Sequence, residues 1–263
     1  MILLKRRQRR EDREEKTEKR RQRREDREEK TEKRNVENQI RNWFINSSPN
    51  IYSITNPPNF IEDISSLSPP PQHIMASFDI TSLYLSLPHS LITDSLHSFL
   101  STAGTDNQTI DIILQLTKLC LSMGTFTFQK QYYSQIRGTP LGSPLSSIIS
   151  EIVLSFLDRW INLTLPSDIY YWRRYVDDIF CIIKSDSLHL IQSTLHSFNS
   201  HIKFTYEAEQ NFVLPFLDIL IIRTPNKFHF TVYYKKTIPP QYTHFSSNSP
   251  IAYKLIQSGH YQR

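Results

Sequence analysis

Two adjacent carboxylates and a third, distant one are the side chains of this sequence best suited to chemistry. Asp177 and Asp178 stand between two strand-like runs, Ile169–Trp172 and Ile179–Ile183, at the position of a hairpin turn. Asp79 ends another apolar run 98 positions before Asp177. Carboxylates at the ends of neighbouring strands can share two Mg²⁺ ions about 3.5–4 Å apart, an arrangement that suits phosphoryl transfer. An Asp-Asp turn in an ordinary hairpin is the alternative, which the pair alone does not exclude.

A tyrosine and a glycine-containing loop are further candidates for a ligand site. Tyr84 follows the first carboxylate by five residues, and from there its ring could lie beneath the sugar of a nucleotide. Arg137 could hold a phosphate, and Gly138 and Gly142 allow a ligand to approach the backbone closely. Pro144 suits the first turn of a following helix, so a simple entry into a helix also explains this loop.

The spacing of apolar residues predicts the elements that position these side chains. The predicted helices are Asn59–Leu67, Ser90–Thr102, Ile110–Met123, Pro144–Ile161 and Ser187–Ser200. The predicted strands are His73–Phe78, Ile169–Tyr175, Ile179–Lys184, His201–Glu207, Pro215–Arg223 and Phe228–Lys235, with Thr125–Gln135 as a strand or hairpin. Strands that alternate with helices favour a layered α/β or α+β domain.

The net charge of +5 belongs to an N-terminal repeat. Residues 5–18 read KRRQRREDREEKTE, and residues 19–32 repeat this sequence. Residues 5–34 hold 16 Lys and Arg against 10 Asp and Glu, whereas residues 35–263 hold 15 against 16, so no broad basic surface is expected there. Because the repeat has no apolar side chain, it offers no coiled-coil seam. We interpret it as a lone charged helix or a disordered extension; nuclear import or RNA binding through Lys5–Arg10 is the alternative.

Cysteine usage and hydropathy exclude several classes of protein. Cys120 and Cys181 are far apart in apolar stretches, which favours reduced, buried thiols over a zinc knuckle or a disulfide scaffold. No run of about 18 apolar residues is present, and Ile2–Leu4 is too short for a signal peptide, so we expect no membrane partner. An intracellular location, nuclear or cytoplasmic, fits these features.

Five segments in a fixed order carry a family resemblance. They are SFDITSLYLSLP (77–88), QIRGTPLGSPLSSIISEIVLSFLD (135–158), YWRRYVDDIFCI (171–182), IKFTYEAEQNFVLPFLDILIIR (202–223) and VYYKKT (232–237). In this order they resemble the palm motifs of retroelement reverse transcriptases, most closely those of Penelope-like elements. The resemblance covers roughly residues 50–250. It implies an α+β polymerase palm, in which an antiparallel sheet packs on helices, and RNA-directed DNA polymerisation by two-metal nucleotidyl transfer.

The resemblance also implies roles for individual residues. Asp79 and Asp177 would bind two Mg²⁺ ions, or Mn²⁺, with Asp178 as a supporting catalytic carboxylate, whereas Asp218 would be structural. Tyr84 would be the aromatic gate that rejects a 2′-hydroxyl. The implied nucleotide-binding residues are Tyr84, Arg137, Gly142 and Ser143, and the implied primer-binding residues are Lys235 and Lys236. The partners would be an RNA template, a DNA primer and deoxynucleoside triphosphates.

The chain departs from the family pattern at both ends of the palm. No Lys or Arg occurs between Arg41 and Lys118, where the family has basic fingers residues, and the chain stops at Arg263, which leaves room for a stub of thumb. We therefore expect a truncated polymerase with little activity of its own, or one whose fingers come from a partner segment. The alternative is a catalytically inactive remnant, either inert or nucleic-acid-binding.

The predicted organisation has four parts. Residues 1–34 form the charged repeat, and residues 35–72 form a proline-rich remnant or linker. Residues 73–225 form the palm, and residues 226–263 form a primer-grip hairpin with the thumb stub.

Overall fold

The computed structural model describes residues 50–122, 124–140, 143–225 and 227–233, together with eight residues between 21 and 38. Gly142 and the lysines at 235 and 236, which were predicted to bind nucleotide and primer, lie outside the described residues. Within the charged repeat, the Arg24 Nε donates a hydrogen bond of 2.8 Å to Glu28 one helical turn away.

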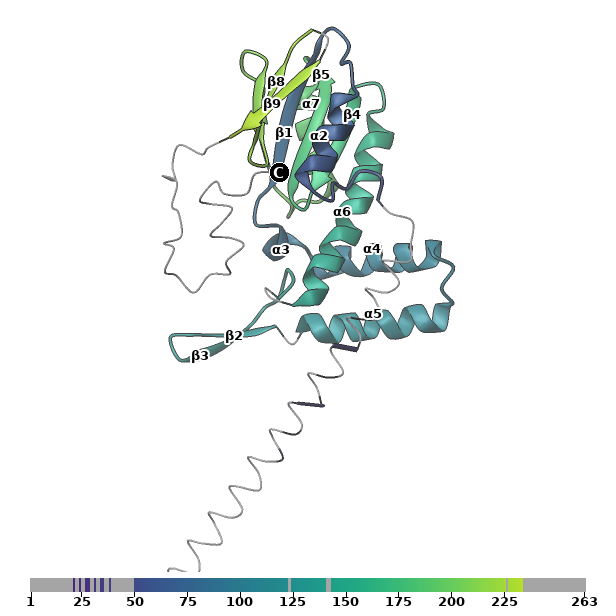
Figure 1. The fold of residues 1–263 in the computed structure, drawn as a ribbon. Helices are drawn as coiled ribbons and strands as arrows, with labels where there is room; N and C mark the ends of the chain where they lie inside the picture. Colours follow the sequence, from purple (N-terminus) through teal and green to yellow (C-terminus); the bar gives the residue numbers. More distant parts are fainter. Residues whose placement is uncertain are drawn as a thin grey trace, which may run out of the picture.

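A four-stranded antiparallel sheet lies at the centre of the described chain (Figure 1). In spatial order its strands are β4 (Ile169–Tyr175), β5 (Asp178–Lys184), β1 (His73–Ile80) and β6 (Phe204–Ala208). The run from Ile179 to Ile183 in β5 is buried at every position, as expected for a strand that is covered on both faces.

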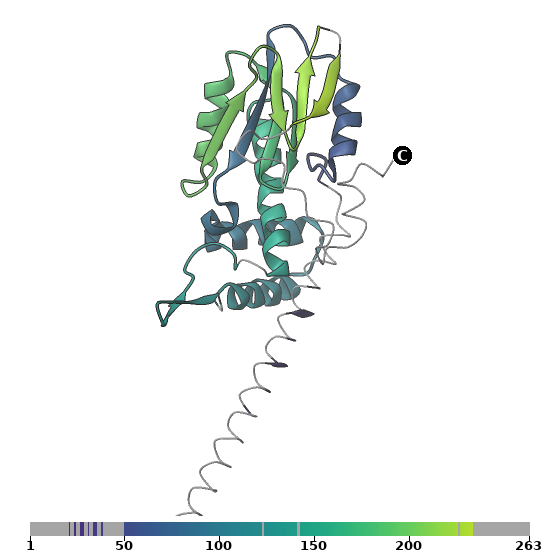
Figure 2. The ribbon, with the colours of Figure 1, turned by 60° about the vertical axis from the view of Figure 1, so that its left-hand side comes forward.

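Helices cover one face of this sheet and extend below it. Helix α6 (Pro144–Thr164) runs along the sheet and continues past its end (Figures 1 and 2). There α4 (His89–Thr102) packs against α6, and α5 (Asn107–Ser122) packs against α4. Helix α7 (Leu188–Phe198) packs beside α6 and against β6.

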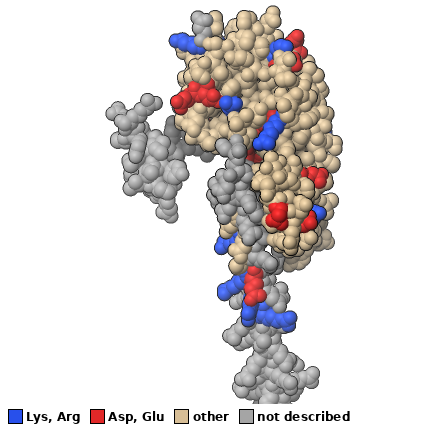
Figure 3. Space-filling view, turned by 90° about the vertical axis from the view of Figure 1, so that its right-hand side faces the viewer, with Lys and Arg blue, Asp and Glu red and all other residues tan. Residues whose placement is uncertain are grey.

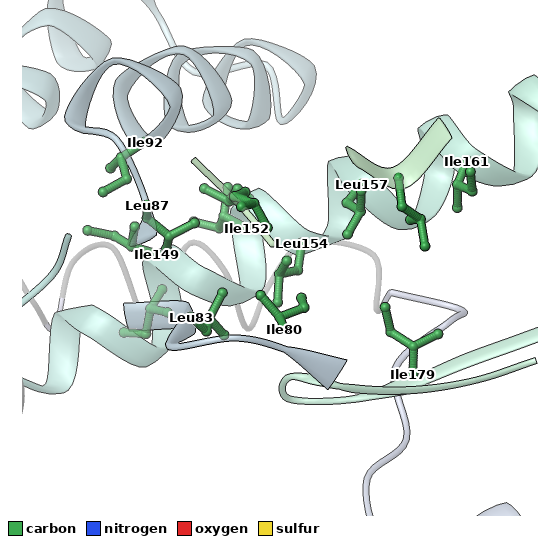
Figure 4. Close-up of a cluster of buried hydrophobic side chains, with 14 of the residues drawn as sticks. Ile80, Leu83, Leu87, Ile92, Ile149, Ile152, Leu154, Leu157, Ile161 and Ile179 are labelled. Carbon is green, nitrogen blue, oxygen red and sulfur yellow. The ribbon is translucent and has the colours of Figure 1, made fainter. Parts of the chain in front are cut away.

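The helix side of the sheet encloses the larger of two hydrophobic cores. Alternation along β1 sends Phe78 and Ile80 into this core and Met75 into the second core. Ile80 lies there with Leu154 and Leu157 of α6, as Figure 4 shows. The position of Asp79 between these core residues therefore turns its side chain away from the helices.

A second layer covers the opposite face of the sheet. It consists of α2 (Pro57–Ser65) and a three-stranded antiparallel sheet of β7 (Val213–Phe216), β8 (Ile219–Arg223) and β9 (Phe228–Val232). Three rings join these parts, because Phe60 lies 5.1 Å from Phe180 and 5.2 Å from Phe216 between ring centroids. Such pairs add about 0.5–1.5 kcal/mol each to the effect of burial.

Polar contacts also fix α2 on the sheet. The Asp63 carboxylate accepts hydrogen bonds of 2.7 Å from the Tyr171 hydroxyl and from the Arg173 Nε. Burial, and then the bond to Asp63, raise the pKa of Tyr171 above its ordinary value. The segment before residue 73 thus contributes a helix to the packing of the sheet.

The remaining elements are short. Helix α3 (Leu83–Ser86) follows β1, and the hairpin of β2 (Thr125–Phe128) and β3 (Gln131–Ser134) projects from the body of the protein (Figures 1 and 2). All eight residues of these two strands are exposed.

The α+β palm predicted from the sequence is confirmed, with differences in detail. The residues predicted as one strand over Pro215–Arg223 form β7 and β8, because a turn at Leu217-Asp218, with Leu217 at φ +48°, reverses the chain. Pro215 is tolerated because β7 pairs only with β8 and is an edge strand. Tyr84 lies on α3, which follows β1 directly. No helix among the described residues has both the length and the apolarity needed to cross a membrane.

Candidate active site

Three aspartates lie at the same end of the central sheet. The register of β1 against β5 pairs Asp79 with Asp178, and the Ile80 amide donates a hydrogen bond of 3.3 Å to the Asp177 carbonyl. The structure therefore brings the end of β1 against the turn between β4 and β5, although the two segments are about a hundred residues apart in sequence.

The electrostatics of Asp79 reflect this crowding. Burial raises its pKa, the negative charge of Asp177 raises it further, and a hydrogen bond from the Thr205 side chain opposes the shift. Asp178 is the residue opposite Asp79 in the strand register. The carboxylate that raises the pKa of Asp79, however, is that of Asp177 in the turn. A cation beside Asp79 and Asp177 would relieve the repulsion between them.

The turn that carries Asp177 has an unfavourable backbone conformation. Val176 has a φ of +55°, and a β-branched residue rarely adopts this left-handed region. Such a residue costs about 1–3 kcal/mol and persists only where its surroundings fix it. Here the Arg174 Nη1 donates a hydrogen bond of 2.8 Å to the Val176 carbonyl.

Arg174 is the centre of a buried ionic network. Its Nε lies 2.9 Å from Asp158 Oδ2, and its two terminal nitrogens each donate a bond of 2.9 Å to Glu151. The side chains of Arg174 and Asp158 have no exposed surface. The Trp172 Nε1 donates a further bond of 2.9 Å to Asp158. The network joins the strand before the turn to residues 151 and 158, which lie about two helical turns apart on one face of α6.

Burial and mutual attraction act in opposite directions on the two fully buried groups of this network, Arg174 and Asp158. Burial opposes the charge of Arg174, but attraction to Asp158 and bonding to Glu151 outweigh it, so the pKa of Arg174 is raised. Burial raises the pKa of Asp158 above its ordinary value, and the adjacent Arg174 charge and three hydrogen-bond donors, including the Asn50 side-chain amide, oppose this rise only in part. These bonds give the buried guanidinium and the buried carboxylate partners on both sides.

An acidic cleft of about 770 Å³ opens beside the three carboxylates. Asp79 and Asp178 line it from the central sheet, Glu207 from β6, and Asp218 from the β7–β8 turn. The Asp218 carbonyl accepts a hydrogen bond of 2.9 Å from the Tyr233 amide, so this turn is fixed to the residue after β9.

The other predicted ligand residues lie elsewhere. Tyr84 is half-buried on α3, and its carbonyl accepts a hydrogen bond of 2.7 Å from the Thr139 amide. Gly138 has a φ of +80°, and a Cβ there would lie 2.5 Å from the Tyr84 carbonyl oxygen, so only glycine fits. Arg137 is exposed and lines a second cleft, and Ser143 is the N-cap of α6. The acidic cleft thus contains two of the three predicted catalytic carboxylates and none of these residues.

The carboxylates fit a divalent cation only in part. No three His, Cys, Asp or Glu side chains in the described ranges converge closely enough to hold a metal ion. Mg²⁺ commonly takes one or two protein carboxylates and completes its shell with water and substrate phosphates. Asp79 and Asp177 match this donor set, because both offer carboxylate oxygens. A cation between them would also offset the repulsion between their charges.

Sequence analysis missed two parts of this site. Thr205 carried no signal, because only the pairing of β6 with β1 places it beside Asp79. Glu151 and Asp158 carried no clear signal either, because the same face of the predicted helix also holds Ser147, Ser155 and Asn162 and therefore resembles an ordinary polar face.

The chain is similar to known proteins in sequence and in fold. The family described as "Reverse transcriptase (RNA-dependent DNA polymerase)" matches residues 29–208. No curated protein matches the chain. Telomerase from Candida albicans, solved with a TWJ fragment of telomeric RNA, has a TM-score of 0.58 at 14% identity over 81% of this chain and 41% of that one. Apo telomerase from Candida tropicalis, truncated from its C-terminal domain, has a TM-score of 0.55 at 16% identity over 75% of this chain and 44% of that one. The chain spans about two fifths of the length of these telomerases, and the likeness shows the fold.

The ionic network predicts a large effect of a single substitution. Arg174→Met leaves Asp158 buried without a cation, and we expect it to lower the free energy of unfolding by about 3–5 kcal/mol. Arg173→Met is the matched control: the neighbouring arginine is 26% exposed and pairs with Asp63, so its loss costs about 1 kcal/mol or less. Urea denaturation measures both values. Equal losses in the two variants would contradict a special role of the buried guanidinium.

The raised pKa of Asp79 predicts that removal of its charge stabilises the fold in a pH-dependent way. The folded protein holds this proton more tightly than the unfolded chain, so ionised Asp79 opposes folding at neutral pH, and the opposition disappears below about pH 3.9. We expect Asp79→Asn to raise the melting temperature at pH 7 without divalent ions, and the gain to vanish towards pH 4. Mg²⁺ or Mn²⁺ should stabilise the wild type more than this variant. A gain of the same size in Asp94→Asn, which removes an exposed carboxylate of α4, would show a general charge effect instead.

Proposed function

The chain belongs to the reverse transcriptase (RNA-dependent DNA polymerase) family, and we propose that its palm performs RNA-directed DNA synthesis with two divalent cations. The observation that carries the proposal is the meeting of Asp79 with the Asp177-Asp178 turn on adjacent strands. An ordinary Asp-Asp turn has no need of a third carboxylate on the neighbouring strand, where like charges cost stability.

Each carboxylate has a proposed task. Asp79 and Asp177 would bind Mg²⁺ or Mn²⁺, with Asp178 as the supporting carboxylate that faces the cleft. Two ions bound there would stabilise the attacking 3′-hydroxyl and the leaving pyrophosphate of an in-line transfer. The hydrogen bond from Thr205 favours the ionised, cation-binding form of Asp79.

The substrates and their contacts are part of the same proposal. Deoxynucleoside triphosphates would meet Tyr84, Arg137, Gly142 and Ser143, and a DNA primer on an RNA template would meet Lys235 and Lys236. A telomerase of similar fold was solved with RNA, which supports an RNA template. The order of the five sequence motifs supports an origin in a Penelope-like retroelement.

The charge of the palm supports a need for additional protein. Residues 50–233 hold 15 Asp and Glu against 10 Lys and Arg. Four of these cations form ion pairs with carboxylates, namely Arg173, Arg174, Lys184 and Arg223. Because an acidic surface repels phosphates, we propose that a partner segment supplies basic fingers. We also propose that residues 1–34 form the charged repeat, 35–72 a proline-rich segment, 73–225 the palm and 226–263 the primer-grip hairpin with a thumb stub. Helix α2 lies in the second of these parts but packs as part of the palm.

Primer extension tests the proposed function. We expect the full chain with a DNA primer, an RNA template and Mg²⁺ or Mn²⁺ to extend weakly, because alignment of the triphosphate can be worth about 7–11 kcal/mol. Addition of a fingers segment should raise extension by orders of magnitude, and Asp177→Asn should abolish it. Asp94→Asn serves as the control and should retain it. Extension that survives in Asp177→Asn would refute the assignment of this carboxylate.

Tyr84 gives a test of substrate choice. If its ring excludes the 2′-hydroxyl, Tyr84→Ala should increase the incorporation of ribonucleotides relative to deoxyribonucleotides. Competition assays with both triphosphates measure this ratio. Tyr170→Ala, which removes a partly exposed tyrosine at the far edge strand of the sheet, should leave it unchanged. An unaltered ratio in Tyr84→Ala would make this residue a packing aromatic.

A further inference from the structure

The β2–β3 hairpin exposes several large aromatic rings that it does not need for its own folding. Phe126 is 55% exposed, Phe128 59% and Tyr132 86%. An isolated two-stranded hairpin is at best marginally stable in water, and single exposed apolar residues are common, but several large rings on one small projection mark an interaction site.

The rings stand on both faces of the ribbon. Phe126 pairs with Tyr133 across the strands, and their rings stack with centroids 5.4 Å apart and planes 16° apart. Phe128 lies on the same face, with its ring 6.5 Å from that of Tyr133. Tyr132 points to the other face, opposite Thr127. One face therefore presents a row of rings, and the other presents a single, almost fully exposed ring.

A cleft of about 900 Å³ lies at the base of this hairpin. Phe126, Ile136 and Arg137 line it from the hairpin and the segment after it, and Leu85 and His89 line it from α3 and α4. The cleft therefore leads from the exposed rings to α3, the helix that carries Tyr84.

The charge around the hairpin differs from that of the rest of the palm. All 15 Asp and Glu of residues 50–233 lie outside residues 112–150, and this segment holds Lys118, Lys130 and Arg137. It is the longest stretch of residues 50–233 without a carboxylate. On the face drawn in Figure 3, by contrast, acidic and basic side chains lie beside one another in several places.

We propose that the hairpin and its cleft form a stacking surface for single-stranded nucleic acid, an inference that rests on the proposed function for the nature of the ligand. A strand that wraps around the ribbon would stack one base on Phe128 on one face and another on Tyr132 on the other face. Lys130 and Arg137 would contact its phosphates. Aromatic rings beside basic residues are the usual means of binding a single strand without reading its sequence. The charge of this region favours a polyanion as the occupant, because residues 112–150 hold three cations and no carboxylate.

RNA-binding measurements on the full chain test this inference. Fluorescence anisotropy with a labelled single-stranded RNA of about 12 nucleotides, and with the same RNA as a duplex, gives the two affinities. We expect the single strand to bind more tightly, and Tyr132→Ala and Phe128→Ala each to weaken it about tenfold. Tyr132→Trp should preserve binding, whereas Tyr132→Leu, which keeps apolar area without a ring, should not.

The chain offers a matched control for these variants. Phe212 is 59% exposed, as Phe128 is, but precedes β7 and lies outside the hairpin, so Phe212→Ala should leave the affinity unchanged. Because Tyr132 is almost fully exposed, its variants should melt like the wild type. Undiminished binding in Tyr132→Ala and Phe128→Ala would overturn the inference. Loss of self-association in Tyr132→Ala, with RNA affinity unchanged, would also overturn it and assign the hairpin to a protein partner.

The result of the RNA-binding measurements can be distinguished from the result of primer extension. Hairpin-dependent RNA binding by a chain that never extends a primer would uphold the stacking surface and count against the proposed function. Extension by a chain whose RNA binding ignores the hairpin would uphold the function and overturn this inference.

Discussion

The buried guanidinium of Arg174 is the interaction on which the rest of the site depends. A charge without solvent contact costs several kcal/mol unless carboxylates and other hydrogen-bond partners surround it. Helix α6 provides these partners at Glu151 and Asp158, so the strand and the helix can meet in only one rotational setting. The same guanidinium holds the Val176 carbonyl, and the strained turn is thereby joined to the most constrained point of the core.

This arrangement explains how the palm can keep like charges together. Asp79 and Asp177 repel each other, and the left-handed Val176 between strand and turn adds strain, so both features favour opening of this end of the sheet. The buried network opposes that opening, because separating β4 from α6 would leave Arg174 unpaired. The acidic site is thus preorganised at the expense of local stability, which is common where a backbone outlier lies beside functional groups.

Much of this fold follows from the sequence, and the exceptions have physical causes. Periodicity placed the central strands and helices, and the carboxylates marked the end of the sheet. The pair Arg173-Arg174 shows the limit: successive strand residues point to opposite faces, so Arg173 reaches Asp63 on α2 while Arg174 enters the helix side. Nothing in the sequence reveals which partner waits on each face. The division of Pro215–Arg223 into β7 and β8 was missed because Leu217, which adopts a positive φ in the turn, is not the Gly or Asn that usually does so.

The acidic site raises a problem that the palm alone does not solve. Carboxylates that attract cations also repel the phosphates of a nucleic acid, and residues 50–233 carry more acidic than basic side chains. A polymerase palm with this composition must separate cation binding from strand binding in space. In this chain the two lie on different elements: the acidic cleft opens at the end of the central sheet, and the acid-free segment 112–150 includes the projecting hairpin. Since α3 follows directly after β1 and also borders the second cleft, it is the element that connects the two regions. Displacement of α3 would therefore reshape the second cleft, which Leu85 lines, and alter the distance between strand and cations.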